Sequence, residues 1–110
     1  SPEAGEIMMA ALISKAPDIK AVFCVNNLVF IGAMKIVQEH EIRTGRHILM
    51  AAFDISRYCS IFKRPLICAS QDQKRLASST VSLLMQGIEN PPGPHNHLVI
   101  PICINEHRID

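Results

Sequence analysis

AVFCVNNLVFIGAM, residues 21–34, is the stretch that decides the fold class of this 110-residue chain. It overlaps an apolar, β-branched run, Ile19–Val25, that predicts a buried strand. Asn26 and Asn27 follow, and an asparagine between a strand and an apolar run is typical of a helix N-cap. Apolar residues then recur at helical spacing, which predicts a helix over Leu28–Glu41. A buried strand that leads straight into a helix indicates a parallel α/β sheet.

The same alternation of elements continues outward from this stretch. Before it, helical spacing predicts a helix over Glu3–Ser14, and Pro2 suits the first turn of that helix. After it, we expect three buried strands and one helix: strands His47–Phe53, Leu66–Ser70 and Leu98–Ile104, and helix Gln73–Ile88. Pro101 lies inside the last strand, which is typical of a sheet edge. The order predicts an α/β fold, a Rossmann-like parallel sheet with flanking helices.

The composition is that of a globular chain and argues against several partners. Hydrophobic residues make up 48% and the net charge is only +1, with basic residues scattered, so we expect no nucleic-acid surface here. No apolar run approaches the roughly 18–20 residues of a membrane span, and the opening Ser1-Pro2-Glu3 shows no signal peptide. We therefore expect no membrane partner and a cytoplasmic location. The four cysteines have no metal-type spacing and are predicted to be free thiols: Cys24, Cys59, Cys68 and Cys103.

No motif indicates catalysis. The sequence holds no G-x-S-x-G elbow, no H-E-x-x-H helix and no glycine-rich phosphate loop. His95 and His97 lie in a proline loop and fit a metal site only loosely, so we interpret them as exposed loop residues. We expect no enzyme, no metal and no cofactor.

Four stretches resemble, in order and spacing, motifs of the lactose-repressor-type (LacI/GalR) transcription regulators. Residues 21–34 are similar to the family's AVFCxNDxxAxGAM, and Ile48–Asp54 to ISVVGFDD. Pro65–Gln71 resembles PPLTTVxQ, and Leu98–Ile102 resembles the closing xLLPxxLxxR. Departures include Asn27 for the usual Asp, Ala52 for a Gly, Ile55 for a second Asp, and Cys68-Ala69 for Thr-Val. The resemblance covers nearly the whole chain and about the last third of a typical member.

This resemblance implies a partial periplasmic-binding-protein-like (type I) fold with two subdomains and a sugar or nucleobase bound in the cleft between them. Residues 1–68 would belong to the C-terminal subdomain. Residues 69–97 would cross into the N-terminal subdomain as a strand and a helix, and 98–110 would form the return strand and tail. A bacterial homodimer is implied, which contacts DNA only through a helix-turn-helix in an absent N-terminal part.

Asn26 and Asp54 follow neighbouring predicted strands, at the edge where open α/β sheets bind ligands. An amide both donates and accepts hydrogen bonds, and a carboxylate accepts from two vicinal hydroxyls, so the pair suits a polyol. The family carries effector contacts at both matching positions, and Gln71 matches a position at the crossing between subdomains. The alternatives are a turn or cap role for Asn26, with Asn27 the preferred cap, a loop cap for Asp54 and a hinge role for Gln71.

Ile31, Ile61 and Phe62 match family positions at the dimer interface. If exposed together they would form an apolar patch that needs a partner, and the alternative is core packing. Two other functions stay open: a solute-binding protein of a transport system, against which the free cysteines count, and a bare interaction module that only dimerises. Because strands at a sheet edge recruit other chains, we also expect the chain to self-associate, by exchange of the segment after Gln71.

Overall fold

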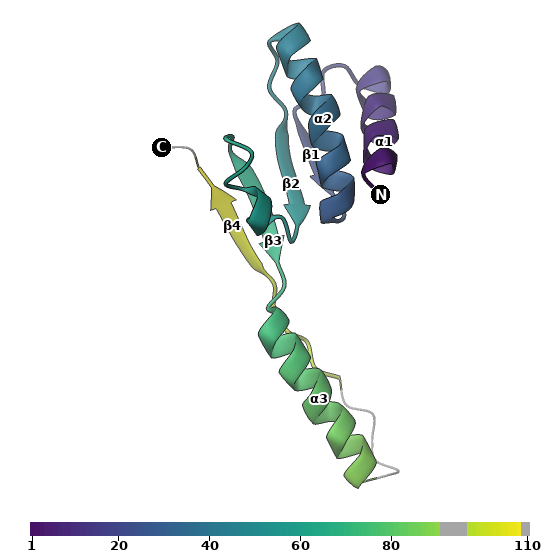
Figure 1. Ribbon diagram of the computed structural model, residues 1–110, viewed down its shortest axis with the longest axis vertical. Helices are drawn as coiled ribbons and strands as arrows, with labels where there is room; N and C mark the ends of the chain where they lie inside the picture. The colour runs from purple at the N-terminus through teal and green to yellow at the C-terminus, as the bar shows by residue number, and fades with distance from the viewer. Residues whose placement is uncertain (91–96, 109–110) are drawn as a thin grey trace. The chain divides into compact units, whose positions relative to one another are not determined.

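The computed structural model describes residues 1–90 and 97–108. They form two compact units, which we call the sheet unit (Ser1–Ser70 with Ile104–Asp110) and the helix unit (Gln71–Cys103). The sheet unit holds an open sheet with two α-helices and a short 3-10 helix, and the helix unit holds one α-helix (Figure 1). Assigning these units to the two subdomains of a binding-protein fold stays a prediction.

The sheet has four strands in the order β1-β2-β3-β4. β1 (Ala21–Cys24), β2 (Leu49–Phe53) and β3 (Leu66–Ser70) are parallel, with Cys24 paired to Ala52 and Ala52 to Cys68. Figure 1 shows β4 (Cys103–His107) running in the opposite direction to β2 and β3. The predicted α/β class with flanking helices is confirmed, and the sheet is mixed because of this last strand.

The last strand is also where the prediction of Leu98–Ile104 is wrong. Residues 98–102 are not in a strand, and β4 begins at Cys103. Pro101 has no backbone N–H to donate to a neighbouring strand, so the ladder starts only after it. The strand then continues through Asn105 and Glu106, polar residues that are poor strand formers but suit the edge of a sheet.

Two helices form successive layers beside the sheet. α2 (Asn27–Thr44) packs on β1 and β2, and α1 (Pro2–Lys15) packs on α2. The hydroxyl of Ser1 caps α1 by accepting from the backbone N–H of Ala4 at 3.2 Å. α2 ends at Gly45, whose φ of 71° is the left-handed conformation that terminates helices. Both predicted helices are confirmed, and α2 runs three residues beyond its predicted end.

Two glycines set the separation of α1 and α2. A Cβ on Gly5 would overlap the carbonyl oxygen of Val29, and a Cβ on Gly32 would overlap that of Pro2. The backbones therefore approach as closely as the absence of a side chain permits.

The core lies between α2 and the sheet. Its largest fully buried side chains are Phe30, Met34, Ile48, Met50, Ile55, Leu66 and Val37. Three of the four free cysteines are buried with them, which agrees with the prediction of small apolar thiols, while Cys103 is exposed. Ile55 is fully buried, so the residue that departs from the family's second Asp serves the core.

The helix unit consists mainly of α3 (Gln73–Glu89), as predicted. The side chain of Asp72 caps it by accepting from the N–H of Arg75 at 3.0 Å. Exposed apolar side chains recur along it at helical spacing: Val81, Leu84, Met85 and Ile88. Across residues 1–90 and 97–108, none of the helices has the length and apolar character needed to cross a membrane.

Candidate functional site

Three polar residues lie at the edge where the parallel strands end: Asn26, Asp54 and Ser70. We call this part of the sheet the carboxyl edge. β1 and β2 are parallel with Cys24 paired to Ala52, so Asn26, two residues beyond Cys24, and Asp54, two residues beyond Ala52, lie at the same edge of the sheet. Phe53 pairs with Ala69, so Ser70, the last residue of β3, lies at this edge too. The structure therefore places the two sequence-predicted residues just beyond the ends of neighbouring strands at one edge, with Ser70 as a third.

Asn26 is the N-cap of α2. Its Oδ1 accepts from the N–H of Val29 at 2.9 Å, and its carbonyl accepts from Phe30 at 3.0 Å. The prediction that Asn27 is the cap is wrong, because Asn27 already has helical geometry and only Asn26 is extended. Asn26 is exposed, and among the described residues none accepts from its Nδ2. The capping bond thus fixes the side chain while leaving its donor group toward solvent.

Asp54 has the only non-glycine backbone of positive φ in residues 1–90 and 97–108, at 56°. Its N–H donates to the carbonyl of Ala69 at 2.9 Å, which ties this turn to β3. Aspartate tolerates the left-handed region better than most residues, but the conformation still costs energy. Strain of this kind concentrates at functional sites, where the surrounding structure maintains it.

Ser70 was missed by sequence reasoning. Its half-buried Oγ lies 3.2 Å from Sγ of the buried Cys68, two residues back on the same strand. The available signal was positional. Ser70 ends the predicted strand Leu66–Ser70, just as Asn26 and Asp54 directly follow two other predicted strands. A hydroxyl there can donate or accept.

The remaining predicted residues are placed differently. Gln71 follows Ser70 directly and begins the helix unit, one residue before the cap of α3, and its effector role stays a prediction. The Phe62 ring packs edge-on against Phe30, with centroids 5.6 Å apart, and Ile31 is partly buried against the core. Only Ile61 is largely exposed, at 66%. Core packing thus accounts for part of this group, and its interface role stays a prediction.

No three His, Cys, Asp or Glu side chains within residues 1–90 and 97–108 are grouped so that they could hold a metal ion. His97 lies within that part of the chain, and His95 lies outside the described residues.

Residues 2–107 match the periplasmic binding protein-like domain family. The chain belongs to this family. Among its curated relatives, the ribose operon repressor of Haemophilus influenzae is 25% identical over 108 residues, which are 97% of this chain and 32% of that protein. The transcriptional repressor PurR of Pasteurella multocida is 28% identical over 87 residues, or 79% of this chain and 26% of that protein. The chain thus spans about a third or less of the length of these relatives.

Two solved structures share the fold. The dimeric Lac repressor with an 11-residue C-terminal deletion matches with a TM-score of 0.74 at 19% identity, over 99% of this chain and 40% of that one. A LacI-family regulator from Corynebacterium glutamicum matches with a TM-score of 0.69 at 18% identity, over 98% of this chain and 42% of that one. These comparisons confirm the resemblance to lactose-repressor-type regulators and their binding-protein-like domain.

Proposed function

We propose that this chain is the effector-sensing and dimerisation part of a cytoplasmic lactose-repressor-type transcription regulator, without enzymatic activity. The observation that carries the proposal is the carboxyl edge, where Asn26 and Asp54 follow the neighbouring parallel strands β1 and β2 and Ser70 ends β3. This is the position at which open α/β sheets bind ligands. The relatives and the solved structures named above are regulators, which favours this function over a transport protein.

The chemistry of this edge suits a sugar. A carboxylate at Asp54 accepts hydrogen bonds from vicinal hydroxyls, and Nδ2 of Asn26 donates to a hydroxyl or ring oxygen. Two exposed apolar side chains flank Asn26, Val25 at 67% and Leu28 at 48%, and they offer contact to the C–H face of a sugar ring. Fixed polar groups among apolar ones are typical of small-molecule sites.

In the intact protein, the effector would act by binding one of two conformations more tightly than the other. The second wall of the cleft, the DNA-binding helix-turn-helix and the operator contacts would come from parts of the protein outside this chain. Gln71 would add a contact from the helix unit, and Ile61, with Ile31 and Phe62, would contact the second subunit of a homodimer.

An NMR titration tests the proposed binding edge. With 15N-labelled chain and D-ribose, we expect weak binding, roughly millimolar, because one cleft wall is missing. Amide shift changes should be concentrated at residues 25–28, 54–56 and 70. A second titration, with adenine in place of D-ribose, distinguishes a nucleobase effector from a sugar effector. Shift changes confined to other residues, or none with either ligand at tens of millimolar, would contradict the proposal and leave the interaction-module function.

A further inference from the structure

A second concave surface lies at the other end of the sheet unit, where β2 and β3 begin. We call it the amino-edge hollow, and its volume is about 880 Å³. Its walls come from the end of α2 and the segments at the start of β2 and before β1 and β3, and they include Lys20, Glu41, Ile42, Leu49, Lys63 and Arg64. Sites for small molecules usually have roughly 300–1,000 Å³. The hollow is therefore large enough for a ligand and is separate from the carboxyl edge.

The apolar part of the hollow is unusually exposed. Ile42 is 87% exposed and Leu49 is 43% exposed, and Pro65 lies beside them in the lining. Isolated apolar side chains on a surface are ordinary, but apolar residues from a helix, a strand and a loop that line one concavity indicate a contact surface. An apolar group seated there would remove this surface from water.

The carboxylate in the hollow is already neutralised. Arg64 binds Glu41 with both terminal nitrogens, at 2.6 and 2.9 Å, and the N–H of Ile48 donates to the same carboxylate at 2.8 Å. Burial raises the pKa of Glu41. The hydrogen bonds and charge of Arg64, together with the N–H of Ile48, lower this pKa by more than burial raises it, so the carboxylate stays ionised in its pair. His47 adds a nitrogen 3.7 Å from Glu41.

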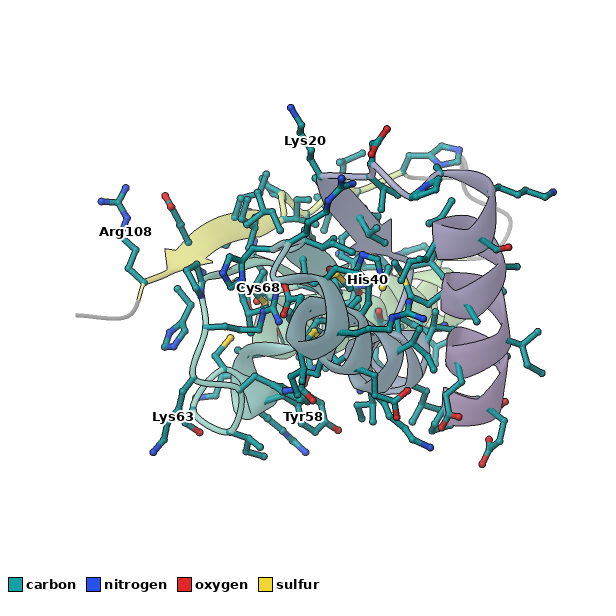
Figure 2. All side chains as sticks on the ribbon, turned by 90° about the horizontal axis from the view of Figure 1, so that it is seen from above. Lys20, His40, Tyr58, Lys63, Cys68 and Arg108 are labelled. Atoms are coloured by element: carbon teal, nitrogen blue, oxygen red, sulfur yellow. The ribbon has the colours of Figure 1, made fainter. Side chains whose placement is uncertain are left out.

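Because Glu41 is paired with Arg64, the remaining charge around the hollow is positive. Lys20 and Lys63 also line the hollow, both are exposed, and neither forms an ion pair with any described carboxylate. Figure 2 shows the two side chains extending outward, away from each other, on opposite sides of the sheet unit. Their flexible stems allow either ammonium group to turn toward a bound anion.

We propose that the amino-edge hollow binds a small organic carboxylate with an apolar body. The apolar body lies against Ile42 and Leu49, and the carboxylate lies at the rim, where the flexible stem of either Lys20 or Lys63 can bring its ammonium group to it. This ligand differs in charge from the uncharged polyol expected at the carboxyl edge, so the two sites would bind different molecules.

Titration of the 15N-labelled chain with 2-naphthoate tests this site, with the uncharged 2-naphthamide as the matched ligand. We expect 2-naphthoate to shift the amides of residues 42 and 47–49, to bind more tightly than 2-naphthamide and to weaken with added salt. Exchanging either lysine, Lys20→Gln or Lys63→Gln, should reduce affinity roughly threefold, and both together roughly tenfold. The control Lys15→Gln, on the exposed end of α1, should leave the affinity unchanged.

Three outcomes would overturn the proposal: equal affinity for acid and amide, shift changes that avoid residues 42–49, or equal weakening by Lys15→Gln. Tighter binding of inorganic phosphate than of 2-naphthoate would also contradict it, because phosphate has no apolar body. None of these results bears on sugar binding, which is followed at other residues.

Discussion

At the scale of single residues, Asn26 and Asp54 each combine a structural role with the proposed binding role. Asn26 caps α2 through its oxygen, and Asp54 holds a left-handed turn between β2 and the 3-10 helix Ser56–Tyr58. The structural roles were the alternatives that the sequence left open, and they do not exclude ligand contact. Substitutions that keep one role and remove the other separate them.

Replacing Asn26 by Asp keeps an oxygen for the cap and removes the two Nδ2 donors. We expect Asn26→Asp to change the free energy of unfolding by less than about 0.5 kcal/mol, and Asn26→Ala to cost about 1 kcal/mol because the Val29 N–H loses its partner. Both variants should weaken sugar binding. Urea unfolding and the ribose titration measure the two effects, and unchanged sugar affinity in Asn26→Asp would remove Asn26 from the binding edge.

Replacing Asp54 tests the strained turn. Asparagine tolerates φ near 56° at least as well as aspartate, so Asp54→Asn should leave stability within about 0.5 kcal/mol while weakening sugar binding through loss of the carboxylate. Valine disfavours this conformation, so Asp54→Val should destabilise by roughly 1–2 kcal/mol more than Asp54→Asn. Equal denaturation midpoints for the two variants would show that backbone conformation does not limit position 54.

At the scale of elements, the sequence predicted most of the fold because its signals were local. Helical spacing and β-branched runs located α1, α2, α3, β1, β2 and β3 within a few residues. The misses depend on neighbours in space. The direction of β4 follows from its pairing at the sheet edge, and its start follows from Pro101. Ser70 is a candidate site residue only because β3 ends at the same sheet edge as β2, which Asp54 follows. The predicted N-cap of α2, Asn27, is one residue too late, because Asn26 and Asn27 are adjacent and give the same local signal.

The close contact of α1 and α2 predicts an asymmetry between two glycines. Gly32→Ala places a Cβ against the carbonyl of Pro2, and backbone must shift, so we expect a loss of roughly 1–3 kcal/mol. Gly87 in α3 has nothing within 4 Å of its Cβ position, and Gly87→Ala should be neutral or stabilising by up to about 1 kcal/mol. Thermal melts followed by circular dichroism compare them, and a Gly32→Ala variant as stable as the parent would argue against this packing.

The Glu41–Arg64 pair predicts a pH dependence. The pKa of Glu41 is below its ordinary 4.5 in the folded chain. Its contribution to stability is therefore fully present above pH 4.5 and is lost as pH falls toward the folded value. Glu41→Gln should be less stable than the parent near neutral pH, and the difference should shrink on acidification below pH 4.5. Urea unfolding across this range measures it, and a constant difference would contradict the assignment.

At the scale of the whole molecule, each unit exposes apolar surface. Phe23 of β1 is 53% exposed although its ring packs edge-on against Phe53, and α3 exposes the stripe that includes Leu84 and Ile88. β1 and β4 are edge strands. We therefore expect the chain to associate as its concentration rises, by pairing or by exchange of the segment after Gln71. Sedimentation velocity measures this, and a single monomeric species at hundreds of micromolar would contradict it.

We propose above all that an effector binds at the carboxyl edge through Asn26 and Asp54. A crystal structure of the regulator that contains this chain, grown with the sugar that raises its melting temperature most, tests it most directly. We expect sugar hydroxyls within hydrogen-bond distance, about 2.5–3.2 Å, of the Asp54 carboxylate and the Asn26 amide. A sugar bound elsewhere, with neither side chain in contact, would contradict the claim.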